Sequence, residues 1–377
     1  KYWLRIIMKV PFVDLSREAN LLFSELINST EQVLKSGIYI NGPNVNKFEN
    51  IAAEYFKVEH AISVGNGSDA LTFILRTLEI KSDSEIIIPA NSFIATAWAV
   101  IAAGAKPIFC DVGSDMLLDI EDFERKISPK TIAVIPVHLT GRVFEIPKIY
   151  NICQKFNIQI IEDAAQSFGA HDDKKNKTGT LGLAGAFSLH PLKNLSIYGD
   201  GGLITTNDKN IAEKSKLFRN HGLIDRDNAA LWGYNSRLDE LQAAYAIIKL
   251  SKIEEFTSKY IEIASFYDKY LSDLFVKPEI RKDFRDVYHN YIVRVPGNLR
   301  NQIKEFLSTN GIGTAIHYPV PLHLQECSRN LDCKKGDLPN VENFANSMIS
   351  LPIYPTLKNE ELKYIVETAN NAIKKFN

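Results

Sequence analysis

Short apolar runs separated by helical patterns occupy the first half of this chain. The runs are rich in β-branched residues and lie at 60–65, 85–90, 106–112, 131–139, 158–164, 184–190 and 201–207. Between most of them apolar residues recur at helical spacing, as over 68–78 and 93–103. Short buried strands that alternate with helices are typical of a mainly parallel sheet covered on both faces. We therefore predict an α/β fold with a seven-stranded, mainly parallel sheet.

Further helical and strand patterns lie on either side of this region. An entry arm with one helical pattern over 17–34 is expected, followed by a second helix over 45–56, and a long helical pattern begins at Ser236. Beyond it we expect strands at 287–295 and 313–319 and helices near 302–310 and 360–375. The predicted parts are an extension over 1–10, a large domain over 11–250 and a smaller C-terminal α+β domain over 251–377.

Composition narrows the class of protein. The 377 residues are 45% hydrophobic, and 44 basic residues balance 45 acidic ones, which argues against nucleic acid or an anionic membrane surface as a partner. No run of 18 apolar residues occurs, so we expect no membrane span. The four cysteines are few for this length, which is typical of a reduced, cytoplasmic protein. Because no CxxC spacing occurs, we expect no metal site.

Lys193 is the first candidate for chemistry. It lies in the connection between the predicted strands 184–190 and 201–207, after Pro191 and before a glycine cluster. A lysine held against a buried sheet meets a low dielectric, which disfavours the ammonium and favours the neutral, nucleophilic amine. Schiff-base lysines are prepared in this way. An exposed loop lysine is the alternative, and for an isolated lysine it is the commoner case.

The segments that follow the predicted strands carry further candidates, because ligands of such sheets bind at the carboxyl ends of the strands. The sequence GNGSD (65–69) opens a helix, where glycines, free amides and Ser68 as N-cap predict a phosphate site. An ordinary strand-to-helix turn is the alternative. Phe93 follows the second strand, and Glu162 and Asp163 end the fifth, where a buried carboxylate requires a partner.

Together these features match the needs of pyridoxal phosphate. That cofactor requires an anion cradle, a stacking surface, a carboxylate opposite its pyridine nitrogen and a lysine for its aldehyde. The residues as they stand also resemble the fold type I sugar aminotransferases of the DegT/DnrJ/EryC1/StrS family, from Pro11 to the C-terminus. The motifs that carry the resemblance are VDL (13–15), GNGSDAL (65–71), VHLTG (137–141), IEDAAQSFGA (161–170), FSLHPLKNL (187–195), YGDGG (198–202), GYNSRLDELQAA (233–244) and HYPVPLHLQ (317–325).

The resemblance implies a role for each matching residue. Lys193 would bind the cofactor covalently, and Asp163 would pair with its pyridine nitrogen. The other cofactor-binding residues that it implies are Gln166 near the ring oxygen, Phe93 stacked on the ring, and Gly67, Ser68 and Ser188 at the phosphate. Asn235 would reach into the site of a neighbouring subunit, which implies a homodimer with shared active sites. Arg237, His317 and Tyr318 are then candidates for binding a sugar nucleotide, whereas His190 is read as structural.

The implied activity is a pyridoxal phosphate-dependent transamination. It would move an amino group from L-glutamate to a nucleotide-linked keto sugar, as in amino sugar and polysaccharide biosynthesis. Family members with histidine in place of the lysine are dehydratases, so Lys193 favours transamination. HYPVPLHLQ resembles members that aminate C3, although Thr140 stands where many relatives have tyrosine. The alternatives are a sugar dehydratase, a cyclitol aminotransferase, a non-catalytic cofactor-binding regulator, or a nucleotide-binding domain in which Lys193 is a loop residue.

Overall fold

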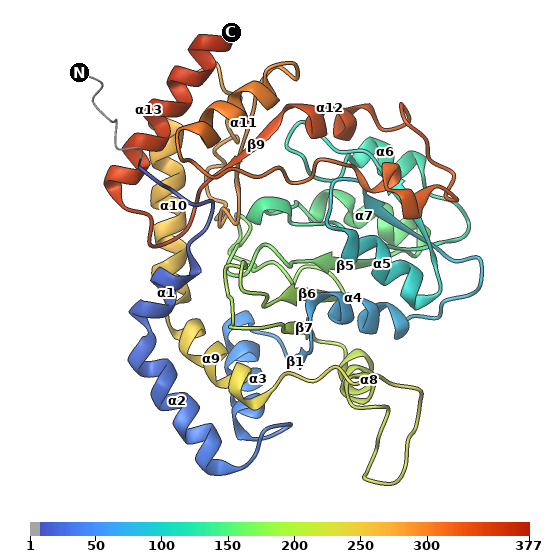
Figure 1. The fold of residues 1–377 in the computed structure, drawn as a ribbon. Helices are drawn as coiled ribbons and strands as arrows, with labels where there is room; N and C mark the ends of the chain where they lie inside the picture. The colour runs from blue at the N-terminus through green and yellow to red at the C-terminus, as the bar shows by residue number, and fades with distance from the viewer. Residues whose placement is uncertain (1–7) are drawn as a thin grey trace.

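A seven-stranded sheet forms the centre of the molecule in the computed structural model, which describes residues 8–377 (Figure 1). Its strands are β1 (His60–Val64), β2 (Glu85–Pro89), β3 (Lys106–Cys110), β4 (Thr131–Val134), β5 (Gln159–Asp163), β6 (Ala184–Ser188) and β7 (Gly202–Thr206). They lie in the order β1-β7-β6-β5-β4-β2-β3, and only β7 runs antiparallel to its neighbours. The predicted seven-stranded, mainly parallel sheet is confirmed.

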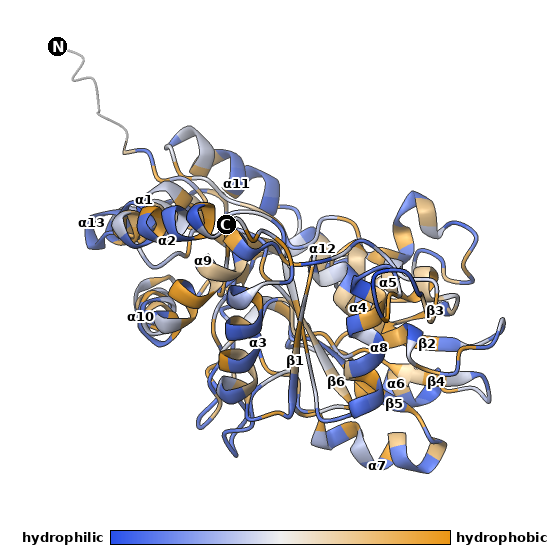
Figure 2. Ribbon diagram, turned by 90° about the horizontal axis from the view of Figure 1, so that it is seen from below, coloured by the Kyte–Doolittle hydropathy of each residue, from blue (hydrophilic) through white to orange (hydrophobic). Residues whose placement is uncertain are grey.

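Helices cover both faces of this sheet, because alternate strand residues point to opposite sides. Ala186 and Ile204 pack in one apolar cluster with α4 (Gly67–Arg76) and α5 (Ile94–Ala103). Phe187 and Leu203 pack in another cluster with α3 (Pro43–Phe56) and α9 (Glu240–Ser251). In Figure 2, hydrophobic residues run along β1 while hydrophilic residues face outward on α3. The remaining elements of this part are α6 (Ile120–Arg125), η1 (Leu139–Gly141), α7 (Pro147–Phe156) and α8 (Lys209–Arg219).

Two of the predicted helices are each divided in two. The entry arm consists of α1 (Leu15–Leu21) and α2 (Phe23–Ser36), and α2 packs beside α9 (Figure 1). The long helical pattern divides at Lys252 into α9 and α10 (Ile253–Tyr270). Apolar residues keep their helical spacing across such a break, so the apolar pattern alone does not show where the helix is interrupted.

The C-terminal part contains a second core. The strands β8 (Tyr291–Arg294) and β9 (Met348–Leu351) pair antiparallel. The expected strand at 313–319 is wrong, since this segment forms only an isolated bridge, between Ala315 and Ser350. The other elements here are α11 (Arg300–Thr309), η2 (Leu322–Leu324), η3 (Glu326–Ser328), α12 (Pro339–Ser347) and α13 (Asn359–Phe376).

Residues from both ends of the described chain meet in this second core. Val10 is buried there with Tyr267 of α10, Tyr291 of β8 and Ile365 of α13. The division into domains near residue 250 stays a prediction, and residues 1–7 of the predicted extension lie outside the described residues. Within residues 8–377, no helix combines the length and the apolar character that crossing a membrane requires.

Candidate active site

Lys193 lies in the tight connection that leaves β6. Its backbone amide donates to the carbonyl of His190 at 2.8 Å. The amide of Leu189 donates to the carbonyl of Gly201, and the amide of Ile197 donates to the carbonyl of Leu189, so the connection is closed by backbone hydrogen bonds. Burial lowers the pKa of the Lys193 amine to about 8, an effect that Asp163 partly opposes. A large fraction of the amine is therefore neutral just above physiological pH, as expected for a nucleophilic lysine.

Asp163 occupies the carboxyl end of β5 and is only 5% exposed. The hydroxyl of Thr96 donates to its Oδ2 at 2.7 Å, and the amide of Ala165 donates to its Oδ1 at 3.2 Å. Thr96 also exchanges a 2.6 Å hydrogen bond with the hydroxyl of Ser92. Because Thr96 stands in the first turn of α5, the positive end of the helix adds to the stabilisation of the carboxylate. The sequence analysis missed Thr96 and Ser92.

Glu162, the other member of the acidic pair, is bonded to backbone amides and to a histidine. Its carboxylate accepts hydrogen bonds from the backbone amides of Gly179, Leu181 and Gly182 at 2.6–2.7 Å. His138 lies 2.9 Å away through Nε2, and its Nδ1 accepts from the amide of Phe144. Since Nδ1 is an acceptor, Nε2 carries the proton and donates to Glu162. Only Asp163 of the pair is free for a ligand.

The start of α4 meets the end of β6. A Cβ atom on Gly67 would lie 2.8 Å from the Cβ of Ser188, so only glycine permits this approach. The first amides of a helix have no intrahelical acceptor, and those of Gly67 and Ser68 belong to this set. The expected role of Ser68 as N-cap is wrong, because the side chain of Asn66 accepts from the amide of Asp69 at 2.9 Å. Free amides and a serine hydroxyl still form an anion cradle.

The side chains of Gln166, Phe93 and Tyr318 come from separate segments and lie together. Gln166 donates from Nε2 to the hydroxyl of Tyr318 at 3.1 Å and accepts from the amide of Thr140 at 2.7 Å. Phe93 is 56% exposed, and its ring centroid lies 6.0 Å from that of Tyr318. Burial raises the pKa of Tyr318, so its hydroxyl stays protonated. An exposed aromatic ring beside polar side chains offers a stacking surface.

Two histidines lie within electrostatic reach of Lys193. His317 contacts the hydroxyl of Ser350 through Nδ1 at 2.8 Å, and burial lowers its pKa to about 4. Burial, followed by the charge of Lys193, lowers the pKa of His289 well below its usual value. Asn194 donates to the carbonyl of Val287 at 3.1 Å and so ties the segment of His289 to the lysine connection. Both imidazoles are neutral, and no motif marked His289 in the sequence.

His190 is exposed and accepts a hydrogen bond from the amide of Leu192 at 3.2 Å, a contact within its own turn.

Asn235 and Arg237 do not join the Lys193 group within one chain. With Asn66, Asp69 and other residues they line an open hollow of about 370 Å³. Among the residues that the structure describes, the buried Nε of Arg237 has no acceptor.

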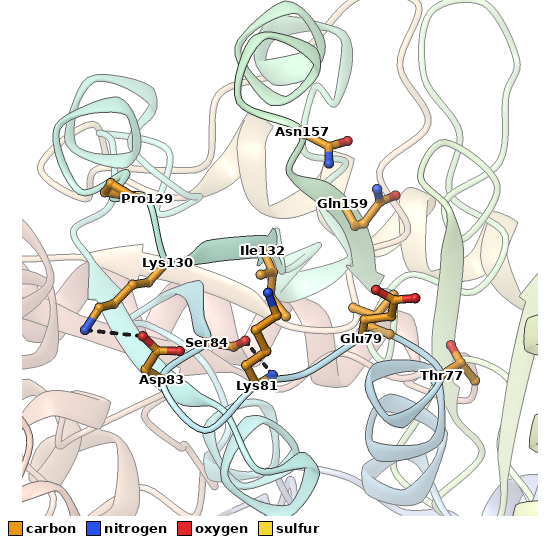
Figure 3. Close-up of a pocket in the computed structure, with 11 residues that line it drawn as sticks. Thr77, Glu79, Lys81, Asp83, Ser84, Pro129, Lys130, Ile132, Asn157 and Gln159 are labelled. Carbon is orange, nitrogen blue, oxygen red and sulfur yellow. Dashed lines mark hydrogen bonds and ion pairs between the residues drawn. The ribbon is translucent and has the colours of Figure 1, made fainter.

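A hollow of about 670 Å³ lies elsewhere, at the amino ends of β2, β4 and β5 (Figure 3). Two of its charged groups, Lys130 and Asp83, form an ion pair at 3.7 Å. Ligands of parallel sheets bind at the opposite, carboxyl ends, where Asp163 lies. This hollow is therefore not the candidate active site.

The residues around Lys193 fit pyridoxal phosphate. The close approach of Gly67 to Ser188 leaves a cradle that a Cβ atom would fill, beside unpaired helix amides. Asp163 offers a carboxylate with an oriented donor set, and Phe93 offers an exposed ring. Anion cradle, carboxylate, ring and amine are the four groups that this cofactor needs.

Comparison with known proteins gives full-length matches. The model of the DegT/DnrJ/EryC1/StrS aminotransferase family matches residues 22–370. A pleiotropic regulatory protein of Geobacillus stearothermophilus is 39% identical over 96% of this chain and 97% of its own length. A dTDP-3-amino-3,6-dideoxy-alpha-D-galactopyranose transaminase of Aneurinibacillus thermoaerophilus is 38% identical over 96% and 99%. The crystal structure of S. venezuelae DesV in complex with a ketimine intermediate superposes with a TM-score of 0.93, at 34% identity over 96% of this chain and 98% of that one.

Proposed function

This chain belongs to the DegT/DnrJ/EryC1/StrS aminotransferase family, and we propose on that basis that it transfers an amino group from L-glutamate to C3 of a nucleotide-linked keto sugar. It is a transaminase whose cofactor is pyridoxal phosphate. The observation that carries the proposal is a half-buried Lys193, whose pKa burial lowers to about 8, within electrostatic reach of the buried carboxylate of Asp163. When bound, the cofactor supplies the electron sink for moving the amino group between two carbonyl carbons.

Each nearby residue has a proposed task in holding this cofactor. The amides of Gly67 and Ser68 and the hydroxyl of Ser188 bind the phosphate at the positive end of α4. Asp163, held by Thr96, keeps a proton on the pyridine nitrogen. Phe93 covers one face of the ring, and Gln166 is oriented toward the ring oxygen by Thr140.

Lys193 moves the proton in this proposal. Its neutral amine would take a proton from the α-carbon of the amino donor and deliver it to the cofactor carbon to which the amino group is transferred. A base works best when its pKa lies near the operating pH, and burial brings the pKa of Lys193 to about 8. Burial lowers the pKa of His317 and of His289, which makes both imidazoles weak bases. The proton transfer is therefore assigned to the lysine.

We further propose a cytoplasmic homodimer in which Asn235 and Arg237 serve the site of the second subunit. Two observations support this assignment. Asn235 and Arg237 line a hollow that lacks Lys193, and Arg237 presents an unpaired buried Nε there among the described residues. Large apolar side chains also remain exposed on the single chain, above all Trp232 at 90%. Guanidinium groups bind diphosphates well, so Arg237 suits the nucleotide, while His317 and Tyr318 suit the sugar.

A non-catalytic regulator is the second candidate, because the Geobacillus stearothermophilus relative carries a regulatory name. A regulator that only binds the cofactor needs the phosphate cradle but not an amine held ready for proton transfer. The lowered pKa of Lys193 and the oriented carboxylate of Asp163 therefore favour the enzyme.

The test is a visible absorption spectrum of the purified protein before and after addition of L-glutamate. We expect a yellow band that bleaches with glutamate, is missing in Lys193→Ala and persists in Lys209→Ala, whose side chain is 79% exposed. Incubation of the glutamate-treated protein with 3-keto and 4-keto nucleotide sugars then distinguishes the regiochemistry, and only the 3-keto substrate should yield an amino sugar. A band unaffected by glutamate would favour the regulator.

A further inference from the structure

A second polar pocket of about 220 Å³ lies behind the loop that supports Gln166. It is bounded by the segments 114–116 and 140–142 on one side and by residues 276–279 and strand β8 on the other. Lys193, Asp163, Phe93 and Tyr318 do not line it. Thr140 does, and its backbone amide holds Gln166. The pocket is thus next to the proposed cofactor site but separate from it.

Arg142 forms the buried wall of this pocket. Its side chain is 8% exposed, and its Nη1 donates to the carbonyl of Glu279 at 2.7 Å and lies 3.6 Å from the carboxylate of Asp286. Among the residues that the structure describes, its buried Nε has no hydrogen-bond acceptor. A buried guanidinium donor without an acceptor is costly, because it has lost water and gained no partner.

Arg294 lines the same pocket from β8. Its guanidinium carbon lies 4.5 Å from the centre of the Phe344 ring, and burial lowers its pKa. Within residues 8–377 it forms no ion pair with a carboxylate, whereas Lys277, the third cation of the lining, is occupied by Asp273. The carboxylates of the lining are Asp115 and Glu279, and Asp286 and Asp273 outside it compensate Arg142 and Lys277. Arg294 is therefore the cation of the lining that no carboxylate pairs with in the described part of the chain.

We propose that this pocket binds a small oxyanion, a carboxylate or phosphate group, between Arg142 and Arg294. Two guanidinium groups, one with a free buried donor and one without a carboxylate partner, are matched by the paired acceptors of such a group. Asp115 and Glu279 do not fill this role. The former accepts from the amide of Leu117 at 3.1 Å, and the latter has a mostly exposed side chain that already pairs with Arg142.

Binding of two anions to the cofactor-loaded protein tests the proposal, since the loaded protein has no free phosphate cradle. Titration calorimetry at constant ionic strength would use orthophosphate in one arm and succinate, a carboxylate that carries no amino group, in the other. We expect at least one anion to bind and its Kd to rise tenfold or more in Arg294→Gln. Arg329→Gln, an exposed arginine outside the pocket, is the control and should bind as the wild type does.

Each outcome decides the proposal. Binding of phosphate alone or of succinate alone supports the pocket and identifies the source of the anion. If neither anion binds, or if Arg294→Gln binds as tightly as the control, the proposal is wrong. Should Arg294→Gln fail to fold, Arg294→Lys keeps the charge but loses the paired donors, so a several-fold weaker Kd is expected. An unchanged Kd in that variant would also overturn the proposal.

Discussion

Replacement of Lys193 by methionine should stabilise the cofactor-free protein, and the gain should depend on pH. The unfolded chain holds the lysine proton with a pKa of 10.5, whereas burial lowers the folded value to about 8. The folded state therefore binds this proton more weakly, and the charged amine destabilises the fold. This cost is fully present below pH 8 and disappears as the pH rises through 10.5.

The magnitude follows from the two pKa values. One pKa unit corresponds to about 1.4 kcal/mol, so the lysine costs about 3 kcal/mol at pH 7, about 2 kcal/mol at pH 9 and under about 0.5 kcal/mol at pH 10.5. Methionine retains an unbranched side chain that fills the same space without the charge. The free energy of unfolding of Lys193→Met should exceed that of the wild type by these amounts.

Urea denaturation of the cofactor-free proteins, followed by circular dichroism between pH 7 and pH 10.5, measures this difference. The protein concentration must be the same throughout, because subunit association contributes to stability. Lys209→Met, at an exposed position, is the control and should show no such dependence on pH. If Lys193→Met is less stable than the wild type at pH 7, or if its gain is equal at all pH values, the assigned environment of Lys193 is wrong.

Other predictions concern hydrogen bonds of the site and its surroundings. Thr96→Val leaves a buried oxygen of Asp163 without its donor, a loss of about 1.5–3 kcal/mol that should lower kcat about 10- to 100-fold, while Thr96→Ser should keep most of the rate. Steady-state kinetics would contradict this if the two variants were alike. Asn66→Ala removes the cap of α4 and should lower the free energy of unfolding by about 1 kcal/mol, as measured in urea; an unchanged midpoint would argue against the cap. Glu162→Gln places an amide opposite three backbone donors and should cost at least about 2 kcal/mol, so an unchanged thermal midpoint would show that these contacts matter little.

The apolar pattern predicted all seven strands of the main sheet, because a strand buried on both faces is a continuous apolar run. Six agree at both ends to within two residues, whereas the run 131–139 continues beyond β4, which ends at Val134. The pattern failed where the chain is only partly buried. The segment 313–319 has an apolar and polar alternation similar to that of a strand, yet Ala315 alone bridges to Ser350, and the neighbouring His317 and Tyr318 turn toward the site. The strand β9 was missed for a different reason. It is fully buried but only four residues long, which gives too little pattern to recognise.

The sequence by itself determined the class of sheet, the family and the residues that match its motifs, because these depend on residue type and local order. Only the tertiary structure decided which partners those residues have. Thr96 lies 67 positions from Asp163, and His289 lies far from Lys193 in the chain, so no local pattern links them. The lowered pKa of Lys193 likewise arises from burial, which exists only in the folded chain. Such contacts become visible only when the chain is folded, because spacing along the chain does not encode distance between its elements.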